Sequence, residues 1–421
     1  MRTEPTSTVT DQATPGLFDR ARLASAADWL AVAVAVSLPW STSATGILLV
    51  LWLIAVLPTL DLAAVRREVM APAGGLPVLL WAFAALGMLW ADVEWRERIA
   101  GLGAFHKLLL IPLFLAQFRR SGRAHWVVLG FLGSSTVLLV FSFALALTPG
   151  LTWRGKTSIG VPFKDYIAQS GIFALCALGL LGQATEFWRQ HRIQHAMMLV
   201  AAAALFVANI LYVATGRTTL VVVAALLLLL GFRRFGGKGS IAVCLIGGTL
   251  AGFTWVSSPY LRLRVTQAIQ EVTDYRERGA QTSAGQRLEF WQRSADFVAQ
   301  APVLGHGTGS IEALFKQAAA AEPGTGALVT RNPHSQVLTV AVQLGIAGAV
   351  LLTAMWLAHL ALFTAATPMA WFGLIVVVQN IVGSLFNSHI GDFTQGWIYV
   401  VGVGVLGGAM RSNAQPRGGT T

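Results

Sequence analysis

The sequence predicts an all-α polytopic membrane protein with about twelve transmembrane helices and a mostly helical outer cap between helices 9 and 10. Of the 421 residues, 55% are hydrophobic and 12% are charged, whereas soluble domains are about a quarter charged. Apolar runs long enough to cross a bilayer recur from end to end. Basic residues lie in short clusters between these runs, as the positive-inside rule requires. The net charge of +11 therefore does not indicate nucleic acid as a partner.

The elements follow in order along the chain. Segment 1–22 is polar and is expected to be a disordered cytoplasmic N-terminus, with no cleavable signal peptide. Segment 23–258 contains helices 1–9, and segment 334–410 contains helices 10–12. Apolar runs of about 17 to 25 residues place the twelve helices near 24–40, 43–60, 72–91, 98–117, 124–148, 166–185, 196–214, 218–232, 240–258, 335–363, 368–386 and 393–410. The span 98–117 is the weakest of these, because His106 and Lys107 interrupt it.

The orientation follows from the basic residues. With both termini inside, the inner side carries fifteen basic residues, including those of the tail 411–421. The short outer loops carry six: Arg96, Arg98, Arg154, Lys156, Lys164 and Arg217. This contrast places the long connection 259–333 outside. Its segments "LRLRVTQAIQEVTDYRERG" and "AGQRLEFWQRSADFVAQAP" have helical periodicity and end at Gly or Pro, which predicts a mostly helical cap.

The stretch "TRNPHSQVL", residues 330–338, is the first candidate for chemistry. Asn332 is predicted to be the N-cap of helix 10 and Pro333 its first residue. His334 would then lie in the first turn, where the helix dipole disfavours a protonated imidazole; a neutral His334 can accept a proton. Its neighbours Arg331, Asn332 and Gln336 are predicted to bind substrate. The alternative is a histidine that merely caps its helix.

Two arginines are the candidate anion contacts. Arg217, in "YVATGRTTL", lies at a break between two apolar runs, where a guanidinium is normally kept for a partner. The alternative is a tight outer turn whose arginine reaches the interface. Arg287, in "SAGQRLEFWQRS", begins an amphipathic helix, and most such arginines are simply solvated.

Other features are weaker. "GHGTGS", residues 305–310, is either a phosphate-binding turn or a hinge. His389 and Asp392 either line the same cavity or cap a helix. Arg154, Lys156 and Lys164 either attract anionic headgroups or anchor the chain at the interface. Cys176 and Cys244 lie in apolar segments and are expected to be small hydrophobes. No spacing supports a metal site, and no nucleotide-binding motif is present, so no cofactor is expected.

The motifs "ATGRT", "GQRLEFW" and "NPHSQVL", in this order on a twelve-helix frame, resemble the bacterial O-antigen ligase family, within a superfamily that includes O-antigen polymerases and pilin-glycan ligases. The resemblance covers about residues 30–410. In that family, an outer loop before a late helix carries an essential histidine and arginine. These match His334 and Arg287, and the arginine after the earlier Thr-Gly matches Arg217. The resemblance raises Arg287 to a candidate catalytic residue.

The resemblance also implies a compartment and substrates. The chain would lie in the inner membrane of a Gram-negative bacterium, with a periplasmic cap and a site facing the periplasm. The donor would be O-antigen glycan linked through diphosphate to undecaprenol, and the acceptor a sugar hydroxyl of the lipid A core. The expected reaction is metal-independent inverting transfer, with His334 as base and the two arginines on the diphosphate. The rivals are a polymerase of the same superfamily, a pilin-glycan ligase and a lipid or sugar transporter.

Overall fold

The computed structural model describes residues 19–148, 159–278, 282–321 and 328–413, and all regular secondary structure in these ranges is helical. The prediction of an all-α chain is confirmed. The described ranges contain sixteen α-helices and two 3₁₀ helices: α1 (Arg20–Ser37), α2 (Thr42–Val56), η1 (Leu57–Thr59), α3 (Leu62–Met70), α4 (Pro72–Gly87), α5 (Trp95–Gly103), η2 (His106–Leu110), α6 (Ile111–Phe118), α7 (Ala124–Leu147), α8 (Tyr166–Arg189), α9 (Ile193–Tyr212), α10 (Arg217–Ser257), α11 (Pro259–Arg278), α12 (Ser283–Gln300), α13 (Ile311–Ala321), α14 (Gln336–Ala361), α15 (Pro368–Ser384) and α16 (Phe393–Asn413).

Seven of the described helices are long and apolar enough to cross a membrane, or up to nine if each of two bent helix pairs is one span. The chain is therefore a multi-pass membrane protein, but the predicted number of twelve spans is not confirmed. The 17-residue α15 is too short by this measure. The predicted disordered segment 1–22 lies outside the described residues up to residue 18, and α1 already begins at Arg20.

The predicted span 98–117 is broken where the sequence suggested weakness. α5 and the η2–α6 segment meet at a bend of 47°, and Lys107 lies in the 3₁₀ turn between them. Its ammonium group donates to the backbone carbonyls of Gly391 at 3.0 Å and Asp392 at 2.6 Å. A buried ammonium needs such acceptors, so the break turns Lys107 towards the loop between α15 and α16.

Two long helices contain a break at glycine. α10 turns back at Gly236, which has φ 66°, and Tyr212 at the end of α9 contacts Ser257 at the end of α10. The predicted spans 218–232 and 240–258 lie on either side of this turn. The helix predicted near 335–363 corresponds to α14, Gln336–Ala361, which is one of the candidate spans but has a break at Gly345, with φ 65°. Segment 302–307 packs against that break, and Ile346 donates to the carbonyl of Pro302 at 2.8 Å.

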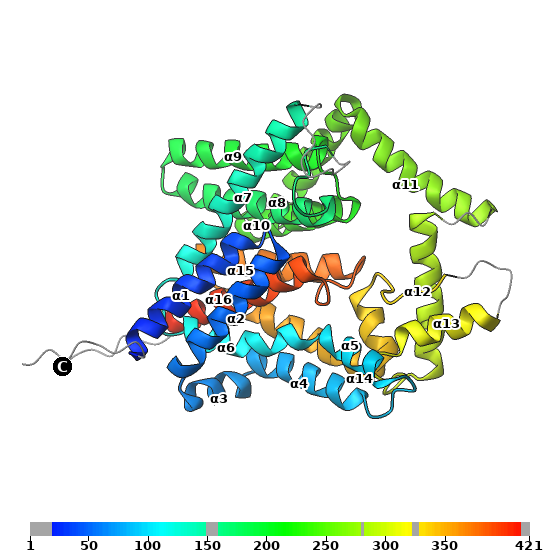
Figure 1. Cartoon of the computed structure of the whole chain (residues 1–421). Helices are drawn as coiled ribbons and strands as arrows, with labels where there is room; N and C mark the ends of the chain where they lie inside the picture. The colour runs from blue at the N-terminus through cyan, green and yellow to red at the C-terminus, as the bar shows by residue number, and fades with distance from the viewer. Residues whose placement is uncertain (1–18, 149–158, 279–281, 322–327, 414–421) are drawn as a thin grey trace, which may run out of the picture.

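Helices α11, α12 and α13 lie together beyond the ends of the bundle helices, at the right of Figure 1. They are the helices that the structure describes within the predicted cap 259–333. α12 and α13 attach to α14 through a small hydrophobic cluster of Phe290, Phe297, Ile311, Phe315 and Val342. The cap therefore rests on the helix that follows the "NPHSQ" motif.

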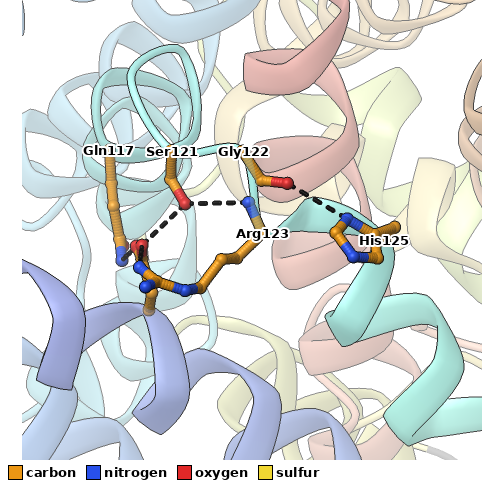
Figure 2. A network of polar contacts seen from close by, with 6 residues as sticks. Gln117, Ser121, Gly122, Arg123 and His125 are labelled. Carbon is orange, nitrogen blue, oxygen red and sulfur yellow. Dashed lines mark hydrogen bonds and ion pairs between the residues drawn. The ribbon is translucent and has the colours of Figure 1, made fainter.

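Buried ion pairs connect helices at the opposite end of the bundle. α16 begins next to the 385–392 loop, and Arg411 lies 18 residues later, roughly 27 Å along the axis. There the fully buried Glu68 of α3 forms ion pairs with Arg411 of α16 and with Arg119. The distance from Oε1 of Glu68 to Nη1 of Arg119 is 2.8 Å. A second polar network, drawn in Figure 2, joins α1 to the end of α6 and the residues after it. Its centre is buried Asp28 of α1, which accepts hydrogen bonds from Gln117, Ser121 and Arg123 at 2.7–3.0 Å.

Candidate active site

His334 lies just outside helix α14, not inside its first turn as predicted. The helix begins at Gln336 with Ser335 as its N-cap residue, and His334 has φ 56°, a left-handed conformation that is costly for a non-glycine residue. The side chain of Asn332 stabilises this turn, because its Oδ1 accepts the backbone N–H of His334 at 2.9 Å. Asn332 is therefore a turn residue two positions before the histidine and not the helix cap.

The surroundings of the His334 ring keep it neutral. Its Nδ1 lies 3.2 Å from Oδ1 of Asn387, and its face lies against Phe290 of α12, with ring centroids 6.2 Å apart and planes at 20°. Burial lowers the pKa of His334 below its ordinary value, the positive charge of Arg287 lowers it further, and the hydrogen bond to Asn387 partly offsets both. The sequence predicted a neutral imidazole because of the helix dipole. In the structure, burial and a neighbouring cation are what keep it neutral.

A polar network joins the "NPH" turn to the loop between α15 and α16. Nδ2 of Asn332 donates to Oδ1 of Asn387 at 3.0 Å, and Ser388 donates to Oδ1 of Asn332 at 2.7 Å. Ser388 also bonds to Thr339 of α14 at 2.7 Å. Gln336 accepts the backbone N–H of Ile390 at 2.9 Å. The loop that carries Asn387 is therefore attached to α14 at two places, Thr339 and Gln336, and to the turn before it at Asn332.

Arg217 begins α10 and is bound by a carboxylate that the sequence did not suggest. Its two terminal nitrogens donate to the two oxygens of Glu271 on α11, at 2.9 and 2.8 Å. Oε2 of Glu271 also accepts the N–H of Ala284 at 3.1 Å. Arg217 holds the pKa of Glu271 below its ordinary value. This two-pronged ion pair connects the bundle to the cap at the junction of α11 and α12.

Arg287, in the first turns of α12, is the second arginine of the site. Among the described residues, no hydrogen-bond or ion-pair partner of its half-buried guanidinium is found. Burial lowers the pKa of Arg287, and the charges of Tyr166, Arg217 and Glu271 act on it as well. Arg287 also acts on His334, so it lies within electrostatic range of both that imidazole and the Arg217–Glu271 pair. A guanidinium that is partly desolvated and unneutralised is suited to bind a ligand anion.

The remaining predicted substrate-binding residues are dispersed. Arg331 is exposed and paired with Glu312. Lys164 donates to Thr394 at 3.1 Å. Asp392 caps α16 by accepting the N–H of Gln395 at 2.8 Å, which is the alternative stated for it. Arg154 and Lys156 lie outside the described residues.

His389 is buried behind the site. Burial lowers its pKa to about 4, which makes it neutral. It lines a small cavity of about 10 Å³ together with Thr218, Gln379 and Gln395. Thr218 directly follows Arg217, so this cavity lies near the N-terminus of α10.

The "GHGTGS" segment does not form a phosphate-binding turn. The N–H groups of His306 and Gly307 donate to the carbonyls of Val342 and Gln343, each at 2.9 Å, and that of Thr308 donates to Gly87 at 3.0 Å. The N–H of Gly309 donates to the side chain of Gln343 at 2.8 Å. With these donors already used, the segment serves to pack against the break in α14.

Sequence reasoning missed Asn387 and Glu271. Each is joined to a predicted residue more than fifty positions away, and no local pattern marks such a pairing. Among the described residues, no three His, Cys, Asp or Glu side chains come together to hold a metal ion. The arrangement provides a proton acceptor, a free guanidinium and a neutralised one, at the junction of cap and bundle.

A comparison with known protein families matches the part of the chain that contains the site. The model of the O-antigen ligase family matches residues 199–353, a range that contains Arg217, Glu271, Arg287 and His334. A comparison with curated proteins finds no match. Residues 199–353 of the chain are thus similar to the O-antigen ligase family.

Proposed function

We propose that the chain is an O-antigen ligase that transfers glycan from an undecaprenyl-diphosphate carrier to a sugar hydroxyl of the lipid A core. The observation that carries this proposal is the neighbourhood of a neutral imidazole and an unpaired guanidinium, His334 and Arg287. Glycosyl transfer from a diphosphate needs both groups: a base for the attacking hydroxyl, and a cation for the leaving group.

The reaction is a single displacement. His334 accepts the proton of the acceptor hydroxyl while the oxygen attacks the anomeric carbon. The bond between that carbon and the diphosphate oxygen breaks, and its electron pair leaves on undecaprenyl diphosphate. Arg287, with Arg217 beside it, stabilises the negative charge that develops there. The new bond forms on the face opposite the leaving group, so the anomeric configuration inverts.

The proposed setting is the inner membrane, with the cap in the periplasm. The basic residues that the positive-inside rule assigns to the cytoplasm include Arg119 and Arg411, which lie at the end of the bundle away from the cap. Both substrates have lipid tails, and a site at the junction of cap and bundle is reached from the outer leaflet without removing those tails from the bilayer.

The test is a defined reaction. Purified protein is mixed with undecaprenyl-diphosphate glycan and lipid A-core in the presence of a chelator. Glycan attached to lipid A-core supports the ligase. Longer chains on the undecaprenyl carrier identify the polymerase of the same superfamily, and no product of either kind, from protein that remains folded, refutes glycosyl transfer. A His125→Gln variant is the control, because His125 is exposed and lies at the network in Figure 2.

A further inference from the structure

The hydrogen bonds around His334 determine which of its two ring nitrogens carries the proton. The backbone N–H of His334 can only donate, so the side-chain atom of Asn332 that lies 2.9 Å away must be the carbonyl oxygen. Ser388 donates to the same oxygen at 2.7 Å. The orientation of the Asn332 amide is thereby settled by its partners.

The next two bonds follow from that orientation. The NH₂ group of Asn332 faces Asn387 at 3.0 Å, and because NH₂ only donates, the facing atom of Asn387 is its oxygen. An amide oxygen only accepts. Nδ1 of His334, 3.2 Å from that oxygen, must therefore be the protonated nitrogen. A neutral imidazole has one N–H, so Nε2 keeps its lone pair.

We propose that Asn387 is a positioning residue that holds His334 in the Nδ1–H tautomer and presents Nε2 as the base. This inference rests on the proposed function for its catalytic meaning, but the tautomer itself is a property of the protein alone. The tautomer of a histidine is set by the hydrogen bond that its other nitrogen makes. Asn387 therefore orients His334 in the way that a third side chain orients the general base in other enzymes.

The frame around Asn387 explains how a loop residue can do this. Lys107 binds the carbonyls of Gly391 and Asp392, and Gln336 binds the N–H of Ile390. The loop is thus held both by the broken helix pair α5–α6 and by the start of α14. Asn387 lies three residues before the first of these attachments and next to Ser388, which is bonded to Asn332 and Thr339. The loop is therefore held in place on α14, which a base requires, since a displacement of about 1 Å can cost a hundredfold in rate.

Two substitutions separate the role of the oxygen from the role of side-chain volume. Asn387→Leu keeps the size and removes the acceptor. We expect kcat to fall about 10- to 100-fold, with KM little changed, because the diphosphate contacts at Arg287 remain. Asn387→Asp keeps an acceptor and adds a negative charge. We expect it to restore the tautomer and most of the rate at high pH.

The aspartate variant also has a pH signature that a structural role does not produce. Arg287 of α12 is the charged group that acts on His334 among the described residues, and Tyr166, Arg217 and Glu271 surround that arginine in turn. A carboxylate at position 387 opposes Arg287 and favours the imidazolium. Since only the neutral imidazole accepts a proton, the acid limb of the rate profile should move to higher pH in Asn387→Asp.

The decisive measurement does not depend on the reaction. Protein labelled with ¹⁵N-histidine is studied by NMR in detergent at about pH 8, above the ordinary histidine pKa, and the His334 signals among the eight histidines are assigned as those lost in His334→Gln. An N–H nitrogen and a lone-pair nitrogen resonate far apart. Protonated Nδ1 in the native chain and in Asn387→Asp, with mixed tautomers in Asn387→Leu, supports the inference.

The possible failures are distinguishable. Protonated Nε2 in the native chain overturns the inference whatever the activity. A second outcome is that the tautomers are as expected but Asn387→Leu transfers glycan at the native rate. The hydrogen-bond assignment then stands, but His334 is not the base, which is a failure of the proposed function. Should Asn387→Leu not fold, the tautomer of the native chain and the pH profile of Asn387→Asp decide, and an unmoved acid limb counts against the positioning role.

Discussion

Removing the negative charge of Glu271 should strengthen donor binding. Glu271 occupies both terminal nitrogens of Arg217, at 2.9 and 2.8 Å, so a diphosphate that reaches this arginine must compete with a carboxylate and lie beside it. Glu271→Gln keeps the size of the side chain and an oxygen for the N–H of Ala284. The substitution therefore removes the competing charge while keeping the junction between α11 and α12.

The expected magnitude follows from the exposure of the pair. The side chains of Arg217 and Glu271 are 28% and 23% exposed, and ion pairs in contact with solvent contribute about 1 kcal/mol at most. At 1.36 kcal/mol per tenfold, the variant should bind the diphosphate about fivefold more tightly. Because Arg217 holds the pKa of Glu271 below its ordinary value, the native carboxylate stays charged at neutral pH. The two proteins should converge only when the pH falls below the usual range of a glutamate.

The assay is a titration of purified protein with a short-chain polyprenyl diphosphate at constant ionic strength, because salt screens exposed charges. Glu186→Gln is the matched control. Glu186 pairs with Arg234 at 3.5 Å near the far end of α8, so its loss of charge should leave the affinity unchanged. If Glu271→Gln binds the diphosphate equally or more weakly, Glu271 holds Arg217 in place for the ligand and does not compete with it, and the reasoning fails.

Three further predictions concern the same machinery and the far end of the bundle. His334→Asn should reduce transfer about 10²- to 10⁴-fold without a loss of thermal stability, because asparagine tolerates the left-handed backbone; a normal rate in the glycan-transfer assay would falsify the base. In the pH profile of kcat/KM, the acid limb should lie below the ordinary histidine pKa range, because burial and Arg287 lower the pKa of His334. In Arg287→Gln, the acid limb of the residual activity should move to higher pH. If it does not move, Arg287 does not act on His334. Glu68→Gln should destabilise the chain by about 3–5 kcal/mol, because the two arginines that bind this fully buried carboxylate lose their partner; thermal unfolding in detergent, with the exposed Asp61→Asn as control, measures it.

The amino-acid sequence by itself determined the helices and the order of the candidate residues. Apolar runs of membrane-spanning length predicted α7 to within one residue, and the break around His106 and Lys107 marks a span that is bent. These are local properties, since hydrophobicity and helical periodicity are carried by neighbours within a few turns. The sequence motifs also showed Asn332 beside His334, with Arg217 and Arg287 earlier in the chain.

Only the tertiary structure decided how these groups are partnered. Asn387 lies 53 positions from His334, and Glu271 lies 54 positions from Arg217; no periodicity relates residues at such separations. The break at Gly345 depends on a segment forty residues earlier that supplies carbonyl groups to α14. The pKa of His334 is likewise lowered by burial and by a charge on another helix. The sequence predicts which chemical groups are present, but their protonation and pairing depend on the packing of distant helices, because burial and Coulomb interactions act through space and not along the chain.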